Sequence, residues 1–306
     1  LKKGIKPILG CEMYVAKRPV GGVAAKEDRS GDHLVLLAKN LKGYKNLIKL
    51  VSLAWIKGFY YTPRIDKELL AQYREGLIAS SACLAGEISD EILNGSMAAA
   101  EKVLEEYVGL FGEDFYLEIQ RHETNDPEAD RTVFPKQQKV IEGIRKLAEK
   151  HNVKIIATND VHFINAEDAE AHDRLICLNT AKDIDDPDRL RYSRQEYLKS
   201  EEEMRTIFSD IPEAIGNVTG LVDKIGKYTL DHDPIMPDFG LPEGFTDENE
   251  YLRSLTYSGA KERWGTLTDE QTERLEFELD TIAKMGFPGY FLIVQDFLRA
   301  AREMGV

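Results

Sequence analysis

The chain is poor in cysteine and has no long apolar run. Its 306 residues include three cysteines, Cys11, Cys83 and Cys177, which are too few for a disulfide scaffold. We therefore expect a reducing compartment and a cytoplasmic location. No apolar run reaches the roughly 18 residues that a transmembrane helix needs, and residues 1–10 are too short and too polar for a secretory signal. The chain also lacks an initiator methionine, which predicts that it is a piece of a longer protein.

Several common catalytic patterns are missing as well. There is no GxxxxGK[ST] loop, no GxGxxG and no serine nucleophile elbow. Basic residues are also outnumbered, with 40 Lys and Arg against 54 Asp and Glu, a net charge of -14. A free-standing nucleic-acid binder normally presents a basic face, so this balance disfavours that class. A module of a larger polypeptide that binds nucleic acid elsewhere stays open.

The sequence does contain a regular alternation of strand-like and helix-like segments over its first two-thirds. Short apolar runs predict strands at 13–15, 33–38, 77–79, 115–119 and 153–157. Apolar residues at helical spacing predict helices at 47–54, 97–110 and 140–148. This alternation predicts a mostly parallel α/β sheet or barrel.

The pattern changes after about residue 199. Ser200, with a glutamate three residues later, predicts a helix N-cap. Residues 231–242 contain three prolines, which is typical of an extended connector. Two long helical patterns follow, at 249–264 and 268–285. We therefore expect a domain boundary between about 212 and 242.

The sharpest local feature is Asp160-Val161-His162, which follows the predicted strand 153–157. Active sites of α/β barrels form at the carboxyl ends of strands. If the backbone stays extended here, the two side chains point to the same side. A carboxylate with an imidazole is a suitable ligand pair for a borderline metal. The alternative is that Asp160 caps the next helix and His162 is an ordinary loop histidine.

Glu12, His33 and Cys83 occupy comparable positions beside predicted strands. A carboxylate next to a buried strand is costly unless it is paired or bound to metal. Singly, Glu12 fits a surface acid, His33 a capping residue and Cys83 a small buried side chain. Together with Asp160 and His162 they form a set of metal-ligating types near strand ends, and the set is more suggestive than any one member.

The other candidate residues give weaker signals. His122 follows the strand 115–119 and could lie at the rim of the same site, whereas His172 fits the solvated face of a helix. The acidic segment 183–188 fits a solvated turn around its proline. Cys11 and Cys177 fit the core.

Five separated segments carry a resemblance to a known family: residues 6–12 (KPILGCE), 33–47 (HLVLLAKNLKGYKNL), 157–162 (ATNDVH), 210–214 (DIPEA) and 285–294 (MGFPGYFLIV). By these segments the chain resembles, in order and almost throughout, the bacterial replicative DNA polymerase III alpha family. It implies a distorted (β/α)7 barrel, the polymerase and histidinol phosphatase (PHP) domain, over residues 1–215. Residues 216–306 would be the connector and the mainly helical start of the polymerase palm.

By this resemblance, Glu12, His33, Cys83, Asp160 and His162 fall on metal-ligand positions of the family, and His122 would be peripheral. A divalent metal such as Zn, Mn, Fe or Mg is implied. It would support phosphoester hydrolysis as a 3′–5′ exonuclease or pyrophosphatase, or it would be structural. In some relatives the ligands are lost.

The sequence departs from the family pattern at both ends. The family's first motif, a His-x-His with further ligands, is absent, so we expect the barrel to lack its N-terminal part and to bind metal partially or not at all. None of the palm's catalytic aspartates is present, so we expect this chain not to polymerise DNA by itself.

The parent chain would be a DNA-directed DNA polymerase acting on template-primer and dNTP. Its partners would be a proofreading exonuclease subunit and the sliding clamp, and it would not associate with a membrane. Two alternatives are a stand-alone PHP phosphoesterase acting on a small phosphate, and a non-catalytic scaffold that docks the proofreading subunit.

Overall fold

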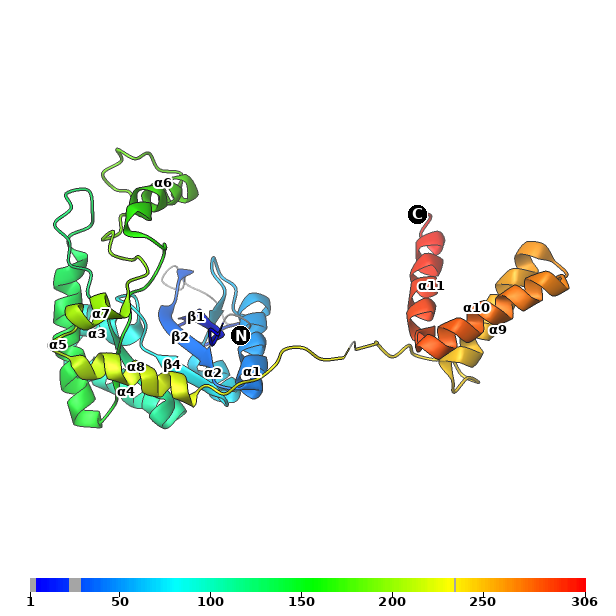
Figure 1. The fold of residues 1–306 in the computed structure, drawn as a ribbon, viewed down its shortest axis with the longest axis horizontal. Helices are drawn as coiled ribbons and strands as arrows, with labels where there is room; N and C mark the ends of the chain where they lie inside the picture. Colours follow the sequence, from blue (N-terminus) through cyan, green and yellow to red (C-terminus); the bar gives the residue numbers. More distant parts are fainter. Residues whose placement is uncertain (1–3, 22–28, 234) are drawn as a thin grey trace. The chain divides into compact units, whose positions relative to one another are not determined.

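The computed structural model describes residues 4–21, 29–233 and 235–306, which form two compact units that divide after Leu230 (Figure 1). The strands of the first unit are β1 (Gly10–Val15), β2 (Asp32–Ala38), β3 (Arg64–Ile65), β4 (Leu77–Ser80), β5 (Phe115–Ile119) and β6 (Ile155–Ala157). Its α-helices are α1 (Leu41–Ile56), α2 (Lys67–Tyr73), α3 (Glu87–Asn94), α4 (Met97–Phe111), α5 (Val133–His151), α6 (Ala169–Thr180), α7 (Glu201–Ile207) and α8 (Pro212–Lys224).

The strands form one open, mixed sheet in the order β3-β1-β2-β4-β5-β6. The strands β4, β5 and β6 are parallel, as the alternation of strands and helices predicts. Strand β2 departs from that prediction, because it runs antiparallel to both β1 and β4. The α/β class is therefore confirmed, whereas the expectation of a mostly parallel sheet is wrong at β2.

The larger core lies between one face of the sheet and the helices α1 to α5. Alternate residues of β2, including Leu34 and Leu36, point into it because side chains alternate along a strand. They meet Leu50 of α1, Leu104 of α4 and Ile144 of α5, all with 0% exposure. A side chain that is fully buried in this way contributes about 1.5–3 kcal/mol.

A smaller core lies on the opposite face of the sheet. Ile78, Tyr116 and Ile156 come from three adjacent parallel strands. They pack against Leu221 and Ile225, and α8 contacts β6 directly. Helix α8 is thus part of the first unit, although the sequence analysis begins the connector at residue 216. That assignment of residues to family domains stays a prediction.

A long segment outside the sheet joins β6 to α7 and contains α6 (Figure 1). It is held to the end of β6 by backbone contacts. The Asn159 side chain donates to the carbonyls of Gln195 at 2.8 Å and Tyr197 at 2.7 Å. The His162 amide donates to the Glu196 carbonyl at 2.8 Å. Residues 195–197 are therefore fixed against the loop that carries Asp160 and His162.

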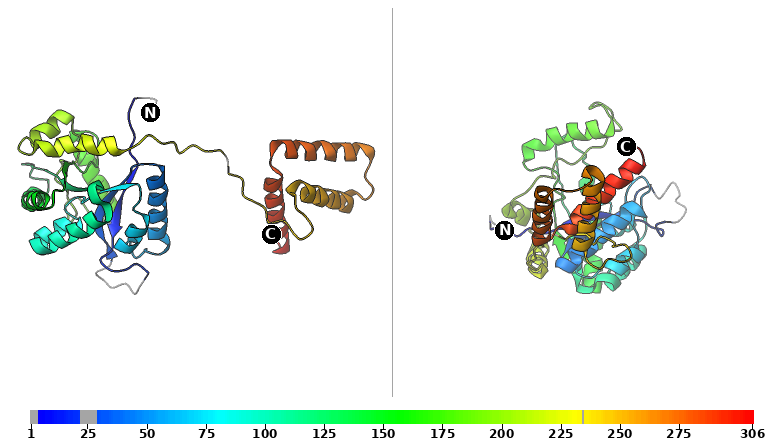
Figure 2. Two further views of the ribbon diagram at one scale, coloured as in Figure 1. Left: turned by 90° about the horizontal axis from the view of Figure 1, so that it is seen from below. Right: turned by 90° about the vertical axis from the view of Figure 1, so that its right-hand side faces the viewer.

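The second unit is helical, as predicted. It contains α9 (Glu248–Trp264), α10 (Asp269–Met285) and α11 (Pro288–Glu303) (Figure 2). Its small core centres on Leu252, Leu279 and Leu292. Gly286 ends α10 at a φ of 73°, where glycine is favoured, and Pro288 begins α11. Residues 285–294, which carry part of the resemblance, thus span the end of α10 and the start of α11.

No helix among the described residues combines the length and the apolar character needed to span a bilayer.

Candidate metal centre

The residues predicted to bind metal gather at one edge of the sheet. Glu12 lies on β1, His33 is the second residue of β2, and Cys83 follows β4. His122 follows β5, and Asp160 and His162 follow β6. Residue Tyr14 near the end of β1 pairs with His33. The carboxyl ends of β1, β4, β5 and β6 thus meet the amino end of the antiparallel β2.

Glu12, His33 and Cys83 are in direct contact. His33 Nδ1 lies 2.6 Å from Glu12 Oε1 and 3.5 Å from Cys83 Sγ. One potential ligand atom from each of the three residues lies within 4.8 Å of the other two. The side chains are 47% exposed for Glu12 and 24% for His33, so the cluster is open to ions from solvent.

The backbone after β4 brings Cys83 to this position. The His33 amide donates to the carbonyl of Ala85 at 2.9 Å, and His33 bridges to Gly86. A Cβ atom at Gly86 would lie 2.1 Å from the carbonyl oxygen of Ser81, so only glycine fits. Ala82 has a φ of 57°, a left-handed conformation that is uncommon away from glycine. The turn is therefore tightly constrained just before Cys83.

The cluster of Glu12, His33 and Cys83 stabilises a bound positive charge, such as the proton on His33. The hydrogen bonds to Cys83 and then to Glu12 raise the pKa of His33 to about 10. The hydrogen bond from His33 lowers the pKa of Glu12. A site that holds a proton this strongly also attracts a metal ion, which would take the place of that proton on the ligands.

Asp160 and His162 lie beside each other, but not in the way an extended chain would place them. Asp160 has a φ of 45°, so the backbone is not extended here and the alternation that would align the two side chains does not apply. The turn leaves Asp160 Oδ1 3.8 Å from His162 Nδ1, while His162 Nδ1 is 2.6 Å from the Asp160 carbonyl. Asp160 caps no helix, since the N-cap of the following 3₁₀ turn is Asn165.

The two groups of predicted ligands influence each other. His162 contributes to lowering the pKa of Glu12. Burial raises the pKa of Asp160, and the charge of Glu12 adds to this rise. The five residues thus form one electrostatic neighbourhood, in which the ligand atoms of Glu12, His33 and Cys83 lie within 4.8 Å of one another.

His122 is buried and already has partners for both ring nitrogens. Nε2 lies 3.2 Å from the Asn159 carbonyl, and the Gln137 side-chain amide lies 3.1 Å from Nδ1. Gln137 also accepts from the His122 amide at 2.7 Å. His122 therefore joins α5 to the loop after β6, and its role as a peripheral ligand stays a prediction.

The sequence analysis did not identify two buried glutamates near these residues. Glu196 accepts from Ser193 through both the amide, at 3.1 Å, and the hydroxyl, at 2.6 Å, and lies 3.6 Å from His122. Glu118 lies within β5, and burial raises its pKa. A charged residue inside an apolar strand is itself a signal, because burying it is costly without partners.

Aromatic side chains cover the His162 side of the site. The Tyr192 ring lies 4.8 Å from the His162 ring, and the His172 ring lies 5.5 Å from it. His172 is half-buried on α6. The prediction that it lies on a helix is confirmed, but its contact with His162 was not predicted.

A second group of ligand types, Glu101, Glu105 and His151, also lies close together. His151 Nε2 is 2.7 Å from Glu101, and Lys150 pairs with the same carboxylate. The Lys150 ion pair and the His151 contact account for this carboxylate, so the group is explained as a polar contact between α4 and α5.

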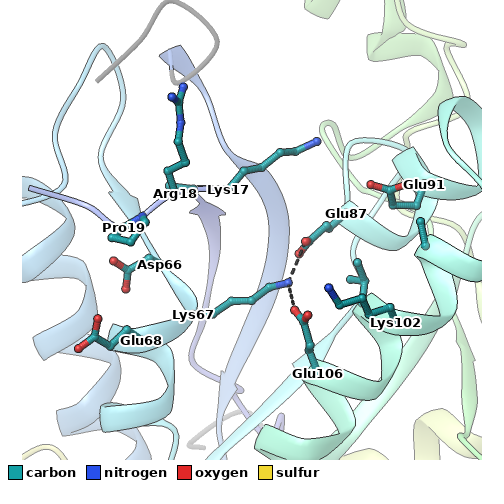
Figure 3. A pocket seen from close by; sticks show the side chains of 13 residues that line it. Lys17, Arg18, Pro19, Asp66, Lys67, Glu68, Glu87, Glu91, Lys102 and Glu106 are labelled. Atoms are coloured by element: carbon teal, nitrogen blue, oxygen red, sulfur yellow. Dashed lines mark hydrogen bonds and ion pairs between the residues drawn. The ribbon is translucent and has the colours of Figure 1, made fainter. Parts of the chain in front are cut away.

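A cavity of about 470 Å³ lies elsewhere in the first unit, and none of the predicted ligands lines it. Figure 3 shows Lys67 directed between Glu87 and Glu106, with distances of 2.8 Å and 2.6 Å. The acidic groups of its wall are thus partly neutralised by the chain's own lysine.

The donor set at the sheet edge fits a divalent metal. Imidazole, thiolate and carboxylate are the three ligand types of zinc, and they also coordinate other transition metals. If His162 donates Nδ1–H to the Asp160 carbonyl, its Nε2 keeps a free lone pair for a metal.

Comparisons with known proteins first show which domain families the chain matches. Residues 1–122 match the family model of the PHP domain. Residues 250–306 match that of the bacterial DNA polymerase III alpha NTPase domain. The first unit therefore carries a PHP domain, and the second unit carries sequence of the polymerase family.

The particular relatives are named DNA polymerase III subunit alpha. The chain is 42% identical to that of Borreliella burgdorferi over 99% of its length, and 39% identical to that of Treponema pallidum over 98%. The subunit of Thermus aquaticus is 35% identical over 99% of the chain. The chain spans about a quarter of these relatives, 26%, 25% and 29% respectively. The resemblance predicted from the sequence is confirmed along nearly the whole chain.

Proposed function

We propose that the first unit binds a divalent metal through Glu12, His33, Cys83, Asp160 and His162 and hydrolyses phosphoester bonds. The observation that carries this proposal is the convergence of Glu12, His33 and Cys83, whose ligand atoms lie within 4.8 Å of one another. The match to the PHP domain over residues 1–122 supports it. When bound, the metal would lower the pKa of a water molecule and polarise the phosphoryl group.

The chain's own residues have distinct parts in this proposal. His33 gives up the proton that it shares with Glu12 and Cys83, because only a neutral imidazole can ligate. His162 keeps its Nε2 free while Nδ1 contacts the Asp160 carbonyl. Tyr192 packs against His162 and limits its rotation.

The larger role follows from the relatives. We infer that the chain is part of a replicative DNA polymerase that synthesises DNA on a template-primer from dNTPs in the cytoplasm. In this proposal a proofreading exonuclease subunit and the sliding clamp are its partners. The open six-stranded sheet would correspond to part of the (β/α)7 barrel, with the PHP region over 1–215 and the connector and palm start over 216–306. The hydrolytic reaction would be 3′–5′ cleavage of DNA or cleavage of pyrophosphate.

The first experiment measures metal binding by the full 306-residue chain. Cobalt(II) is titrated, and the thiolate-to-cobalt absorption band reports ligation by Cys83. We expect the band in the wild type and in Cys11→Ser, and its loss in Cys83→Ser. Cys11 is a matched control, since it is also half-buried but hydrogen-bonds the Glu12 carbonyl at 3.5 Å instead of His33.

The second experiment measures the reaction. The chain loaded with Mn²⁺ or Zn²⁺ is given 5′-labelled single-stranded DNA and, separately, pyrophosphate. Asp160→Ala should abolish hydrolysis, while His232→Ala, at an exposed histidine outside the first unit, should leave it unchanged. Metal binding without hydrolysis would instead favour a structural metal site, and no metal binding would favour the scaffold alternative.

A further inference from the structure

Glu118 is a buried carboxylate held entirely by uncharged donors. All five residues of β5 are buried, and Glu118 is 6% exposed. Its Oε2 accepts from the Ser80 hydroxyl at 2.6 Å. Its Oε1 accepts from the Thr158 hydroxyl at 2.5 Å and from the Gln120 amide at 3.1 Å. Both carboxylate oxygens therefore have partners.

These donors come from the ends of three adjacent strands. Ser80 is the last residue of β4, Gln120 is the first residue after β5, and Thr158 is the first residue after β6. Each stands just before a predicted ligand. Ser80 precedes Cys83 by three residues, and Thr158 precedes Asp160 by two.

The Glu118 backbone adds a further link on the same side. Its amide donates to the Ser81 hydroxyl at 2.9 Å, so two consecutive serines of the turn before Cys83 are fixed to one residue of β5. No hydrogen bond among the described residues joins Glu118 to Glu12, His33, Cys83, Asp160 or His162. Glu118 thus lies behind the ligands rather than among them.

Burying the Glu118 carboxylate has an energetic cost that its partners must offset. Burying a carboxylate is expensive unless hydrogen bonds and nearby charges compensate, and a buried apolar side chain would avoid the cost. A carboxylate can accept hydrogen bonds from several strands at once, since it has two oxygens and no donor. A carboxylate at this position is explained if its hydrogen bonds fix the strand ends, even though burying it costs folding free energy.

We propose that Glu118 is a positioning residue of the metal centre, which fixes the starts of the loops that carry Cys83, Asp160 and His162. This inference rests on the proposed function. Residues behind metal ligands orient those ligands, and their loss typically weakens metal binding by about 10–100-fold.

The test compares Glu118→Gln with Asp66→Asn in the full chain. Asp66 is a matched control, because it is also a buried carboxylate, 7% exposed, and accepts from uncharged donors, the amides of Val20 and Leu69, each at 2.8 Å. Cobalt(II) affinity, the ligand-field spectrum of the bound cobalt and the Tm of the metal-free protein are measured. We expect Glu118→Gln to weaken cobalt binding about 10–100-fold and to change the spectrum, and Asp66→Asn to leave both unchanged.

The results distinguish the proposed metal centre from the proposed role of Glu118. If wild-type protein binds no cobalt, or if Cys83→Ser binds it equally well, the proposed metal centre is wrong and the role of Glu118 falls with it. If the wild type binds through Cys83 and Glu118→Gln has the same affinity and spectrum, the centre stands and the positioning role is refuted, even where the Tm falls.

A second variant covers the case in which Glu118→Gln does not fold. Thr158→Val removes one donor and keeps the shape of the side chain. We expect it to weaken cobalt binding several-fold with little change in Tm, because one of the three links is lost. Unchanged cobalt affinity in folded Thr158→Val would overturn the inference.

Discussion

The buried ion pair between Asp173 and Arg189 is expected to hold the segment that joins β6 to α7. Asp173 lies on α6, and Arg189 lies in the loop after it. Two contacts join them, at 2.5 Å and 2.8 Å, and the side chains are only 9% and 1% exposed. Arg189 also donates to the Ile184 carbonyl at 2.8 Å.

The magnitude follows from this burial. Removing one member of a buried pair leaves the other charge without compensation, which costs about 3–5 kcal/mol. We therefore expect that amount for Asp173→Asn. The loss should be smaller for Arg189→Met, because Arg194 lies 3.6 Å from Asp173 and still compensates its charge. The exposed pair of Glu170 and Arg174 on the same helix is the control, at 68% and 66% exposure, and Arg174→Met should cost far less, because solvent screens an exposed ion pair.

Urea unfolding followed by circular dichroism measures these costs, and limited proteolysis locates the loosened region. Cleavage in Arg189→Met should increase within residues 181–199, whose backbone is fixed to the loop of Asp160 and His162. A double variant should lose less than the sum of the two single changes, since neither charge is then left alone. Costs below about 1 kcal/mol for both single changes, with unchanged cleavage, would refute this account of the pair.

Three further changes test other parts of the structure. Ser200→Ala removes the capping box with Glu203 and should cost about 1 kcal/mol in urea unfolding, a cost that Ser200→Asp should largely avoid. Gly86→Ala would place a Cβ 2.1 Å from the Ser81 carbonyl, so it should lower both the Tm and cobalt affinity; wild-type values of both would show that the turn can adjust. Burial lowers the pKa of Lys199 to about 8, so the folded protein releases this proton more readily than the unfolded chain. Stability should therefore rise from about pH 8 toward 10.5, by no more than about 1 kcal/mol for this half-exposed group, and Lys199→Gln should remove that part of the rise.

Periodicity predicted the strands β1, β2, β4, β5 and β6 and the helices α1, α4, α5, α9 and α10, whose patterns are long enough to recognise. It gave no prediction for α2, α3 or α8. Strand β3 has only two residues, Arg64 and Ile65, and so gives no periodic signal. The direction of β2 depends on the connection before it. A parallel neighbour needs a crossover, usually a helix. No helix was predicted between β1 and β2, and this absence already favours the antiparallel direction that the structure shows.

The candidate site could be approached from the sequence because its residues are polar side chains next to apolar strands. Glu12, His33 and Cys83 meet in the structure, but their pairing depends on the antiparallel register of β2, which periodicity does not encode. Glu118 and Glu196 were missed because their partners lie far apart along the chain or in an irregular loop. Such contacts are set by tertiary packing.

The charge of the site sets a condition on any phosphoester chemistry there. Burial, and then the charge of Glu12, raise the pKa of the Asp160 carboxyl, and the whole chain carries a net charge of -14. A phosphate group is also anionic, so Coulomb repulsion keeps it away from these carboxylates. Binding of inorganic phosphate should therefore require divalent metal, and calorimetry should detect it with Mn²⁺ and not with EDTA. Equal binding in EDTA would mean that lysine or arginine side chains recognise the phosphate, and the proposed role of the five ligands would then lose its electrostatic basis.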